Sequence, residues 1–229
     1  MNNVSILDYS QAFVFVVFLK KIKMRKILVG LLLTIVSASC EAQVDKFAKI
    51  PALKPQQKKA YFASGCFWCV EGVYERVQGV DAVISGYAAG AMKNPSYYNH
   101  GNHTETVLVI YDSTKVSYAQ LVGVFFEITN PYTVGQAPDF GASYRSAVFP
   151  KEGNQQTLIM EQLKRYPNHK IDVAPFANAN FHPAENYHQD YVRRLEAGEQ
   201  VVNRSYGINV SIPRRNDFVR ATKIPLKKQ

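Results

Sequence analysis

The sequence has few cysteines and no apolar run of membrane-spanning length, and both absences exclude whole classes of protein. Only three cysteines occur in 229 residues, Cys40, Cys66 and Cys69. The last two are three residues apart, so they cannot staple distant loops, and a disulfide-stabilised scaffold is excluded. The apolar stretch at residues 27–36 is too short for a transmembrane helix, which needs about 20 residues. A chain of this length can bury a substantial core without covalent staples.

The sequence also lacks an excess of charge in its central part. The formal net charge is +9 at pH 7, but residues 41–212 hold 16 basic and 16 acidic residues. The positive surplus therefore lies in residues 1–40 and 213–229. Because the central part is neutral, we expect no nucleic-acid-binding surface.

Residues 1–42 are typical of an export signal rather than of a folded element. A basic cluster precedes the apolar stretch, and the small residues at 37–39 lead directly to Cys40. Small residues before a cysteine resemble a bacterial lipobox, so we predict a lipid anchor at Cys40. The match departs from the lipobox at Ser37, where that motif usually has a larger aliphatic residue. Cleavage after Ala42 without lipidation is the alternative, and Met24 is an alternative start. We expect an exported protein of the cell envelope or periplasm.

The remaining sequence predicts a tether at residues 43–57, a folded domain at 58–206 and a basic, solvated C-terminal tail at 207–229. Hydrophobic periodicity predicts strands at 60–64, 80–85, 104–111, 145–149 and 171–174, and helices at 66–78, 117–127, 154–165 and 184–195. Strand–helix–strand units on either side of one strongly β segment indicate an α+β fold. We predict a two-layer sandwich with a mixed sheet, a ferredoxin-like plait, covered by helices. Two long loops, at 86–103 and 128–143, complete it.

The segment from Gly65 to Cys69 carries the clearest chemistry, because a predicted strand ends there and a helix begins. Unpaired N–H groups and the helix dipole at a helix N-terminus favour a thiolate, which is the nucleophilic form of Cys66. Gly65 allows a sharp turn that leaves the sulfur accessible. Cys69 lies one helical turn further on, at a separation compatible with a disulfide. Such a pair can attack an oxidised substrate with one sulfur and resolve the product with the other.

The letters GCFW at residues 65–68 resemble the signature of type A methionine sulfoxide reductases. Similar segments follow in the family's order: GYAAG at 86–90, NPSY at 94–97, HTETVLVIYD at 103–112, ITNPY at 128–132, PDFGASYRSAVFP at 138–150 and AENYHQDY at 184–191. The resemblance covers most of residues 58–206. It implies an oxidoreductase that reduces the S epimer of methionine sulfoxide, free or in oxidised proteins, without a metal or organic cofactor.

The resemblance also implies roles for single residues. Cys66 attacks the sulfoxide sulfur and becomes a sulfenic acid, while Glu105 protonates the oxygen as a general acid, with burial raising its pKa. The other matched positions are Tyr97 and Tyr144, which hydrogen-bond the sulfoxide oxygen, Phe67 and Trp68, which form the apolar wall for the S-methyl group, and Asp139, a polar support. Taken singly, each of these residues is more often an ordinary core or surface residue.

Recycling is where the chain departs from the family, many members of which carry resolving cysteines in a C-terminal tail. No cysteine follows Cys69 here. Either Cys69 resolves the sulfenic acid or an external thiol does. In the second case Cys69 is only a small residue on the buried face of the helix. We expect a thioredoxin-like envelope dithiol as the reductant and partner, and a monomeric enzyme. We also expect His188 to be structural.

Three other functions compete with this interpretation. A structural zinc site would combine the two cysteines of the helix with His100 and His103. A thioredoxin-like thiol-disulfide oxidoreductase would make Cys69 indispensable and Glu105 dispensable. A noncatalytic envelope binding module would leave both GCFW and Glu105 unexplained.

Overall fold

The computed structural model describes residues 46–151 and 153–228. The chain divides into two units, Met1–Lys46 and Phe47–Gln229, and the predicted export signal with Cys40 lies outside the described residues. Of the predicted tether, residues 46–56 contain no helix, and Ala48 N–H donates to Ala184 O at 3.0 Å. In the described residues no helix is long and apolar enough to cross a bilayer.

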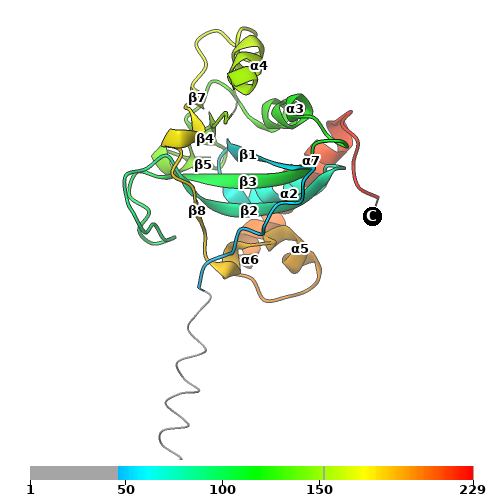
Figure 1. The fold of residues 1–229 in the computed structure, drawn as a ribbon. Coiled ribbons are helices and arrows are strands. Elements are labelled where there is room, and N and C mark those ends of the chain that lie inside the picture. Colours follow the sequence, from blue (N-terminus) through cyan, green and yellow to red (C-terminus); the bar gives the residue numbers. More distant parts are fainter. Residues whose placement is uncertain (1–45, 152, 229) are drawn as a thin grey trace, which may run out of the picture. The chain divides into compact units, whose positions relative to one another are not determined.

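A six-stranded mixed sheet is the centre of the folded unit (Figure 1). Its strands are β1 (Gln57–Ala63), β2 (Val80–Ala88), β3 (Thr104–Asp112), β6 (Ala147–Val148), β7 (Asp172–Val173) and β8 (His182–Pro183). They lie in the order β7-β6-β1-β3-β2-β8, with β6 and β7 parallel and the other neighbours antiparallel. A separate hairpin pairs β4 (Gly135–Gln136) with β5 (Asp139–Phe140). The predicted α+β class with a mixed sheet is confirmed.

The helices of the described residues are short, and several are single turns. They are α2 (Phe67–Tyr74), α3 (Tyr118–Ile128), α4 (Gly153–Leu163), α5 (Tyr191–Glu196), α6 (Arg204–Tyr206) and α7 (Ile212–Ala221). A π-helical turn, η4 (Gly207–Ser211), joins α6 to α7, and 3-10 turns cover η1 (Ala142–Tyr144), η2 (Phe176–Asn178) and η3 (Asn186–His188). Helix α3 begins with a capping box, in which the Ser117 hydroxyl accepts the Gln120 N–H and the Gln120 side-chain oxygen accepts the Ser117 N–H.

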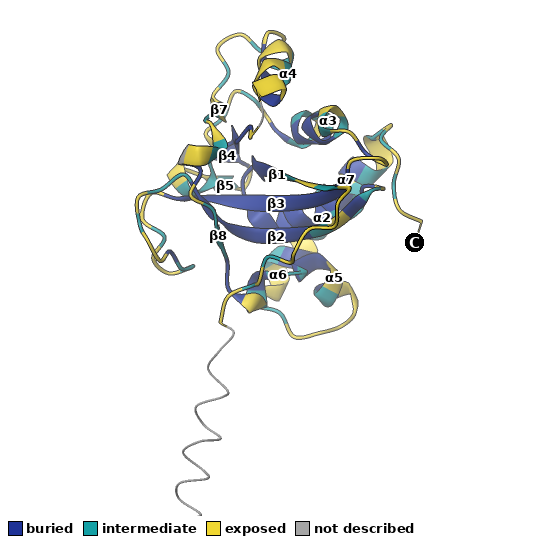
Figure 2. Cartoon of the chain, viewed as in Figure 1, coloured by how far each residue is buried: buried dark blue, intermediate teal, exposed yellow. Residues whose placement is uncertain are grey.

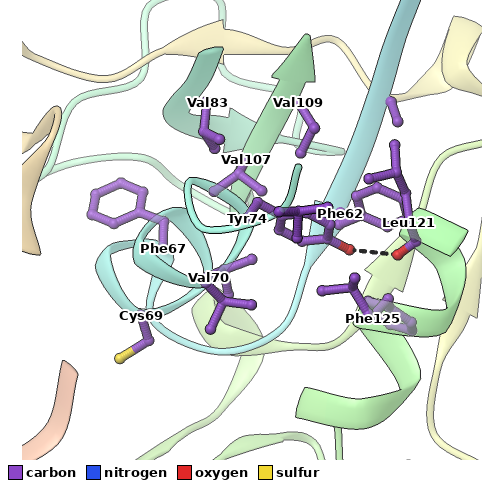
Figure 3. Close-up of a cluster of buried hydrophobic side chains, with 14 of the residues drawn as sticks. Phe62, Phe67, Cys69, Val70, Tyr74, Val83, Val107, Val109, Leu121 and Phe125 are labelled. Carbon is purple, nitrogen blue, oxygen red and sulfur yellow. Dashed lines mark hydrogen bonds between the residues drawn. The ribbon is translucent and has the colours of Figure 1, made fainter. Parts of the chain in front are cut away.

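The main core lies between the sheet and helices α2 and α3. All nine residues of β3 are buried, and the three central strands are dark throughout most of their length in Figure 2. Phe62 of β1 stacks on Tyr74 of α2 with ring centroids 5.0 Å apart and on Phe125 of α3 at 5.9 Å. The Tyr74 hydroxyl donates to Leu121 O at 3.0 Å, which ties the two helices together (Figure 3). Both helices therefore cover the same face of the sheet.

The helix predicted at residues 184–195 is wrong in its first half. The structure has a 3-10 turn at Asn186–His188, a left-handed Asp190 (φ 54°) and a helix only from Tyr191. The cause is the exposed edge of β2. Gln189 accepts a hydrogen bond from Ser85 N–H at 2.9 Å and donates to Ser85 O at 3.1 Å, so this side chain completes the strand edge. Pairing with β2 overrides the helical periodicity.

The predicted solvated tail is also wrong, because residues 204–221 form α6, η4 and α7. Phe218 is 4% exposed and Arg215 7% exposed. Arg215 donates to both carboxylate oxygens of Glu196, at 2.7 and 2.6 Å. A bidentate pair of this kind satisfies the guanidinium inside the fold. The helical segment at residues 204–221, whose second half is rich in basic residues, is thus part of the folded unit, and α7 packs against α2.

We predict that Phe218→Ala lowers the free energy of unfolding by about 3–5 kcal/mol, because the ring is removed from a filled core site. Urea denaturation followed by circular dichroism measures the change. Arg220→Ala, at an exposed position of the same helix, is the control and changes stability by less than about 0.5 kcal/mol. Equal stability of Phe218→Ala and the control would show that α7 is not packed.

Candidate active site

The turn between β1 and α2 places the predicted nucleophile at a helix N-terminus. Gly65 has φ +73°, and a Cβ on it would lie 2.8 Å from Cβ of Gln136, so both the backbone conformation and the space require glycine. Cys66 is the N-cap residue of α2, and its carbonyl accepts N–H groups of Cys69 (3.1 Å) and Val70 (3.3 Å). The sequence prediction that Cys66 opens the helix is confirmed.

A cavity of about 80 Å³ lies beside Cys66 and collects residues from well-separated parts of the chain. The lining residues are Cys66, Phe67, Trp68, Tyr97, Glu105, Asp139, Tyr144, Asn203 and Tyr206. Seven of these are positions that the sequence predicted, drawn from α2, β3, β5, η1 and the loop before β3. Cys69, the eighth predicted residue, does not line the cavity and is fully buried behind it. Cys66 therefore is the thiol that meets a ligand in this cavity.

Glu105 is buried, and its carboxyl group faces the start of α2. Only 2% of the residue is exposed, so the solvent-facing alternative for this strand position is wrong. Its Oε2 accepts the Phe67 N–H at 2.9 Å. Burial, assisted by the charges of Asp139 and Cys69, raises the pKa of Glu105 to about 8 against the lowering effect of that N–H. A carboxylic acid that is protonated at neutral pH can donate a proton to a bound ligand.

The fold shifts the pKa values of the two thiols in opposite directions. Burial, followed by the hydrogen bond to Cys69 and the charges of Cys69 and Glu105, raises the pKa of Cys66 well above its ordinary value. The pKa of Cys69 is lowered to about 6 by the hydrogen bond from Cys66, against burial, with Arg214 and Ser211 assisting. These directions favour Cys69 over Cys66 as the thiolate of the pair, which is opposite to the direction expected from the helix N-terminus alone.

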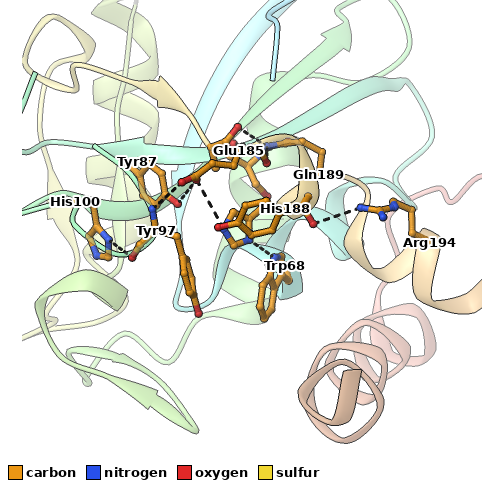
Figure 4. Close-up of polar contacts among 11 residues, drawn as sticks. Trp68, Tyr87, Tyr97, His100, Glu185, His188, Gln189 and Arg194 are labelled. Carbon is orange, nitrogen blue, oxygen red and sulfur yellow. Dashed lines mark hydrogen bonds and ion pairs between the residues drawn. The ribbon is translucent and has the colours of Figure 1, made fainter. Parts of the chain in front are cut away.

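A buried polar network supports the aromatic wall of the cavity (Figure 4). Trp68 Nε1–H donates to His188 Nδ1 at 3.1 Å, and the indole stacks on Tyr191 with ring centroids 4.1 Å apart. His188 Nε2 lies 3.8 Å from Glu185 Oε2, and burial lowers the pKa of His188 to about 4. The neutral imidazole therefore accepts from Trp68 and presents its other nitrogen to the carboxylate. His188 lies behind Trp68 and does not line the cavity, as expected for a structural residue.

The same network positions Tyr97. Glu185 Oε1 accepts the Tyr97 N–H at 3.1 Å, and its Oε2 accepts the Tyr87 hydroxyl at 3.0 Å. Glu185 is 1% exposed, so its carboxyl group makes these contacts inside the fold. The sequence matched this residue within AENYHQDY but assigned it no role. The burial of Glu185, which only the structure reveals, is the signal that would have pointed to its role.

Tyr206 and Asn203 are cavity residues that the sequence analysis missed. The Tyr206 hydroxyl donates to Asp139 Oδ2, and it lies 3.8 Å from Cys69 Sγ. Burial raises the pKa of Tyr206, followed by the charges of the two cysteines. Neither residue belongs to a motif with recognisable chemistry. The helical segment that begins at α6 brings them to the site.

The histidines of the zinc alternative have other partners. His103 accepts the Gly90 N–H at 3.2 Å and bonds Met92 O at 2.9 Å, while His100 bonds Tyr97 O and the Ser143 hydroxyl. They brace the long loop before β3. Within the part of the chain that the structure describes, no three His, Cys, Asp or Glu side chains form a group that could hold a metal.

Comparisons with known proteins agree on one family. The family described as Peptide methionine sulfoxide reductase matches residues 58–216. Among curated proteins, a peptide methionine sulfoxide reductase of Mesorhizobium japonicum is 38% identical over 149 residues, which are 60% of this chain and 76% of the relative. One from Rhizobium meliloti is 41% identical over 157 residues, 66% of this chain and 79% of the relative.

Solved structures agree with the sequence comparisons. Methionine sulfoxide reductase A of Corynebacterium diphtheriae superposes with a TM-score of 0.56 and 27% identity, covering 66% of this chain and 81% of that one. Mxr1 of Saccharomyces cerevisiae in its reduced form superposes with a TM-score of 0.58 and 25% identity. That superposition covers 69% of this chain and 97% of the yeast chain.

We predict that Glu105→Gln changes how stability depends on pH. The pKa of Glu105 is about 8 in the fold against an ordinary 4.5, so its stabilising effect is fully present below about pH 4.5 and is lost as the pH rises through 8. The unfolding free energy of the wild type should therefore fall relative to Glu105→Gln by more than about 1 kcal/mol between pH 5 and 8.5. Urea denaturation at both pH values measures this, with Glu127→Gln at an exposed position as control. Parallel pH profiles of Glu105→Gln and wild type would contradict a protonated, buried Glu105.

Proposed function

Because this chain belongs to the peptide methionine sulfoxide reductase family and is an oxidoreductase, we propose that it reduces the S epimer of methionine sulfoxide through a sulfenic acid on Cys66. The substrates are oxidised proteins and free methionine sulfoxide, so the chain repairs oxidative damage. The observation that carries the proposal is the cavity that the Cys66 thiol and the buried carboxyl of Glu105 line together with Tyr97 and Tyr144.

The lining residues suit each step of a sulfoxide reduction. Tyr97 and Tyr144 keep their protons, since burial raises the pKa of both, and they can donate to the sulfoxide oxygen. Glu105 supplies a proton to that oxygen, because oxygen leaves sulfur poorly without one. Phe67 and Trp68 provide the apolar surface for the S-methyl group. Asp139 accepts from Tyr206 and so acts through the position of that hydroxyl.

The proposed first half-reaction balances without a cofactor. As Cys66 attacks the sulfoxide sulfur, its thiol proton passes to the thiolate of Cys69, whose pKa the fold lowers to about 6. Oxygen is transferred from the substrate sulfur to the sulfur of Cys66, and the proton that it needs comes from Glu105. The products are methionine and the Cys66 sulfenic acid. An external dithiol of the thioredoxin type then returns the two electrons, either directly or after resolution by Cys69.

Turnover of the two separated epimers of a methionine sulfoxide peptide, with dithiothreitol as reductant, tests this function. We expect the purified chain to reduce only the S epimer. Cys66→Ser should have no activity, because the nucleophile is lost, and Glu105→Gln should lower kcat/KM by about 10²–10⁴-fold, because the general acid is lost. The Glu127→Gln variant is the matched control.

Two results would contradict the proposal. One is no reduction of either epimer by folded, fully reduced protein. The other is an activity in which Cys69 is indispensable and Glu105 dispensable, since that order is expected of a thiol-disulfide oxidoreductase.

We also propose that the chain is exported, monomeric and anchored through a lipid on Cys40. The sequence features of residues 1–42 support the export signal and the anchor. Mass spectrometry of the mature N-terminus from a bacterial host tests the anchor. A diacylated Cys40, and release of Cys40→Ala into the soluble fraction, are the expected outcomes. An unmodified N-terminus that begins after Ala42 would contradict the lipid and leave export intact.

The finer fold assignment, a ferredoxin-like plait, is likewise a proposal. It is supported by the chain order β1-α2-β2-β3-α3-β6, by the sheet order β6-β1-β3-β2 and by the placement of α2 and α3 on one face of the sheet. Strands β7 and β8 extend this core at its two edges.

A further inference from the structure

Helix α2 carries a second buried carboxyl group, that of Glu71, which the proposed chemistry does not use. Glu71 has no exposed surface. It follows Trp68 by three residues, so the two side chains lie on the same side of the helix. Helix α5 packs against α2, and the approach is so close that a Cβ on Gly72 would lie 2.9 Å from Val192 Cγ2. The question is therefore what this carboxyl group does at the contact between α2 and α5.

The first turn of α5 receives its cap from Glu71 rather than from its own sequence. Asp190 precedes the helix in a left-handed conformation, with φ 54°, and its side chain makes no capping hydrogen bond. The N–H group of Tyr191, the first residue of the helix, has no partner within α5. Glu71 Oε2 accepts this N–H at 3.2 Å. A side chain of α2 thus caps α5 across the contact between the two helices.

The contact needs an acceptor oxygen and no charge. Burial, followed by the charge of Glu75, raises the pKa of Glu71 well above its ordinary value, which favours the neutral carboxyl group. Its Oε1 is buried and has no hydrogen-bond partner among the described residues, a situation that is costly for a charged carboxylate. A glutamine side chain, which is neutral and of the same length, can therefore make the same contact with Tyr191.

Tyr191 connects this cap to the cavity through its ring and its hydroxyl group. The ring lies parallel to the Trp68 indole, with 8° between the planes and 4.1 Å between the centroids. The hydroxyl lies 2.9 Å from Val202 O and 2.8 Å from Asn203 O and donates to these carbonyls. Trp68 and Asn203 line the cavity, whereas Tyr191 and Glu71 do not. The place of Tyr191 therefore supports two parts of the cavity wall from behind.

We propose that Glu71 is a positioning residue of the active site, which caps α5 at Tyr191 and so holds the ring that supports Trp68 and the hydroxyl that supports Asn203. This proposal rests on the proposed function, because Trp68 belongs to the wall proposed for the S-methyl group. A contact between that wall and a methyl group is the same in the bound substrate and in the transition state. Its loss therefore raises KM and leaves kcat nearly unchanged.

Steady-state reduction of a methionine-S-sulfoxide peptide by the full chain, with dithiothreitol as reductant, tests this role. Glu71→Leu removes the acceptor oxygen and should raise KM at least about fivefold, the equivalent of one ordinary hydrogen bond, with kcat within about twofold of wild type. Glu71→Gln keeps the acceptor and should have the KM of the wild type. Tyr74→Phe is the matched control, because it removes a buried hydrogen bond of the same helix, to Leu121 O, and should leave KM unchanged.

The fluorescence of Trp68 tests the placement of the wall without any turnover. Trp68 is the only tryptophan of the chain, so the emission reports this side chain alone. Loss of its support by Tyr191 exposes the indole to water. The emission maximum of Glu71→Leu should therefore shift to longer wavelength, and acrylamide should quench it more strongly. Glu71→Gln and Tyr74→Phe should keep the emission of the wild type.

Circular dichroism checks that each variant is folded. If Glu71→Leu does not fold, Glu71→Asp replaces it in both measurements. Aspartate keeps a carboxyl group in the buried site, but its side chain is one methylene shorter and withdraws the oxygen from the Tyr191 N–H. It should therefore show the same rise in KM and the same shift in emission.

The outcomes separate the two proposals. If either the KM or the Trp68 emission of the folded variant equals that of the wild type, Glu71 is not a positioning residue. The same conclusion follows if Glu71→Gln has the defects of Glu71→Leu, or if Tyr74→Phe has them, since the effect is then not specific to the cap. No sulfoxide reduction by the wild type would overturn the proposed function, while the emission measurement would still decide whether Glu71 places Trp68.

Discussion

The hydrogen bond from Phe67 N–H to the side-chain carboxyl of Glu105 is the contact on which the site depends. It joins the first turn of α2 to the central strand β3, and so it fixes the distance between the helix that carries both cysteines and the acid. The same carboxyl is almost fully buried, which keeps it protonated near neutral pH although an N–H group favours its charged form. Every residue of β3 is buried, so the place of Glu105 on this strand determines both where its carboxyl group lies and that it is protonated.

Around this contact the fold adds a shell of aromatic and buried polar groups. Trp68 is held by His188 on its ring edge and by Tyr191 on its face, and Glu185 holds the backbone of Tyr97. These supporting residues come from the segment that also completes the edge of β2. A cavity wall fixed in this way changes little when a ligand arrives, and such preorganisation is what positions a reacting group.

The C-terminal segment supplies the remaining side of the site. Tyr206 reaches Asp139 at the cavity, Ser211 contacts Cys69, and Arg214 bonds carbonyls of β1's end and α3's end. Its helix is held by the core contact of Phe218 and the bidentate pair of Arg215 with Glu196. The positive charge that the composition places in this segment is therefore partly structural. Arg215 pairs with a glutamate inside the fold, and Arg214 donates to two backbone carbonyls.

The sequence by itself determined the local elements and the chemistry that short motifs encode. GCFW after a strand, the TETVLVIY strand and the Ser117 capping box each specify their structure through neighbouring residues, and the structure has all three. Seven of the eight predicted site residues line one cavity, because the motifs that carry them lie in order on a shared scaffold. Tertiary structure alone decided the break in the helix before Tyr191, the packing of residues 204–221 and the directions in which the pKa values of the two cysteines shift. Those outcomes depend on contacts between segments far apart in the chain, such as Gln189 with Ser85 and Arg214 with Ile128, and on burial, which no local pattern measures.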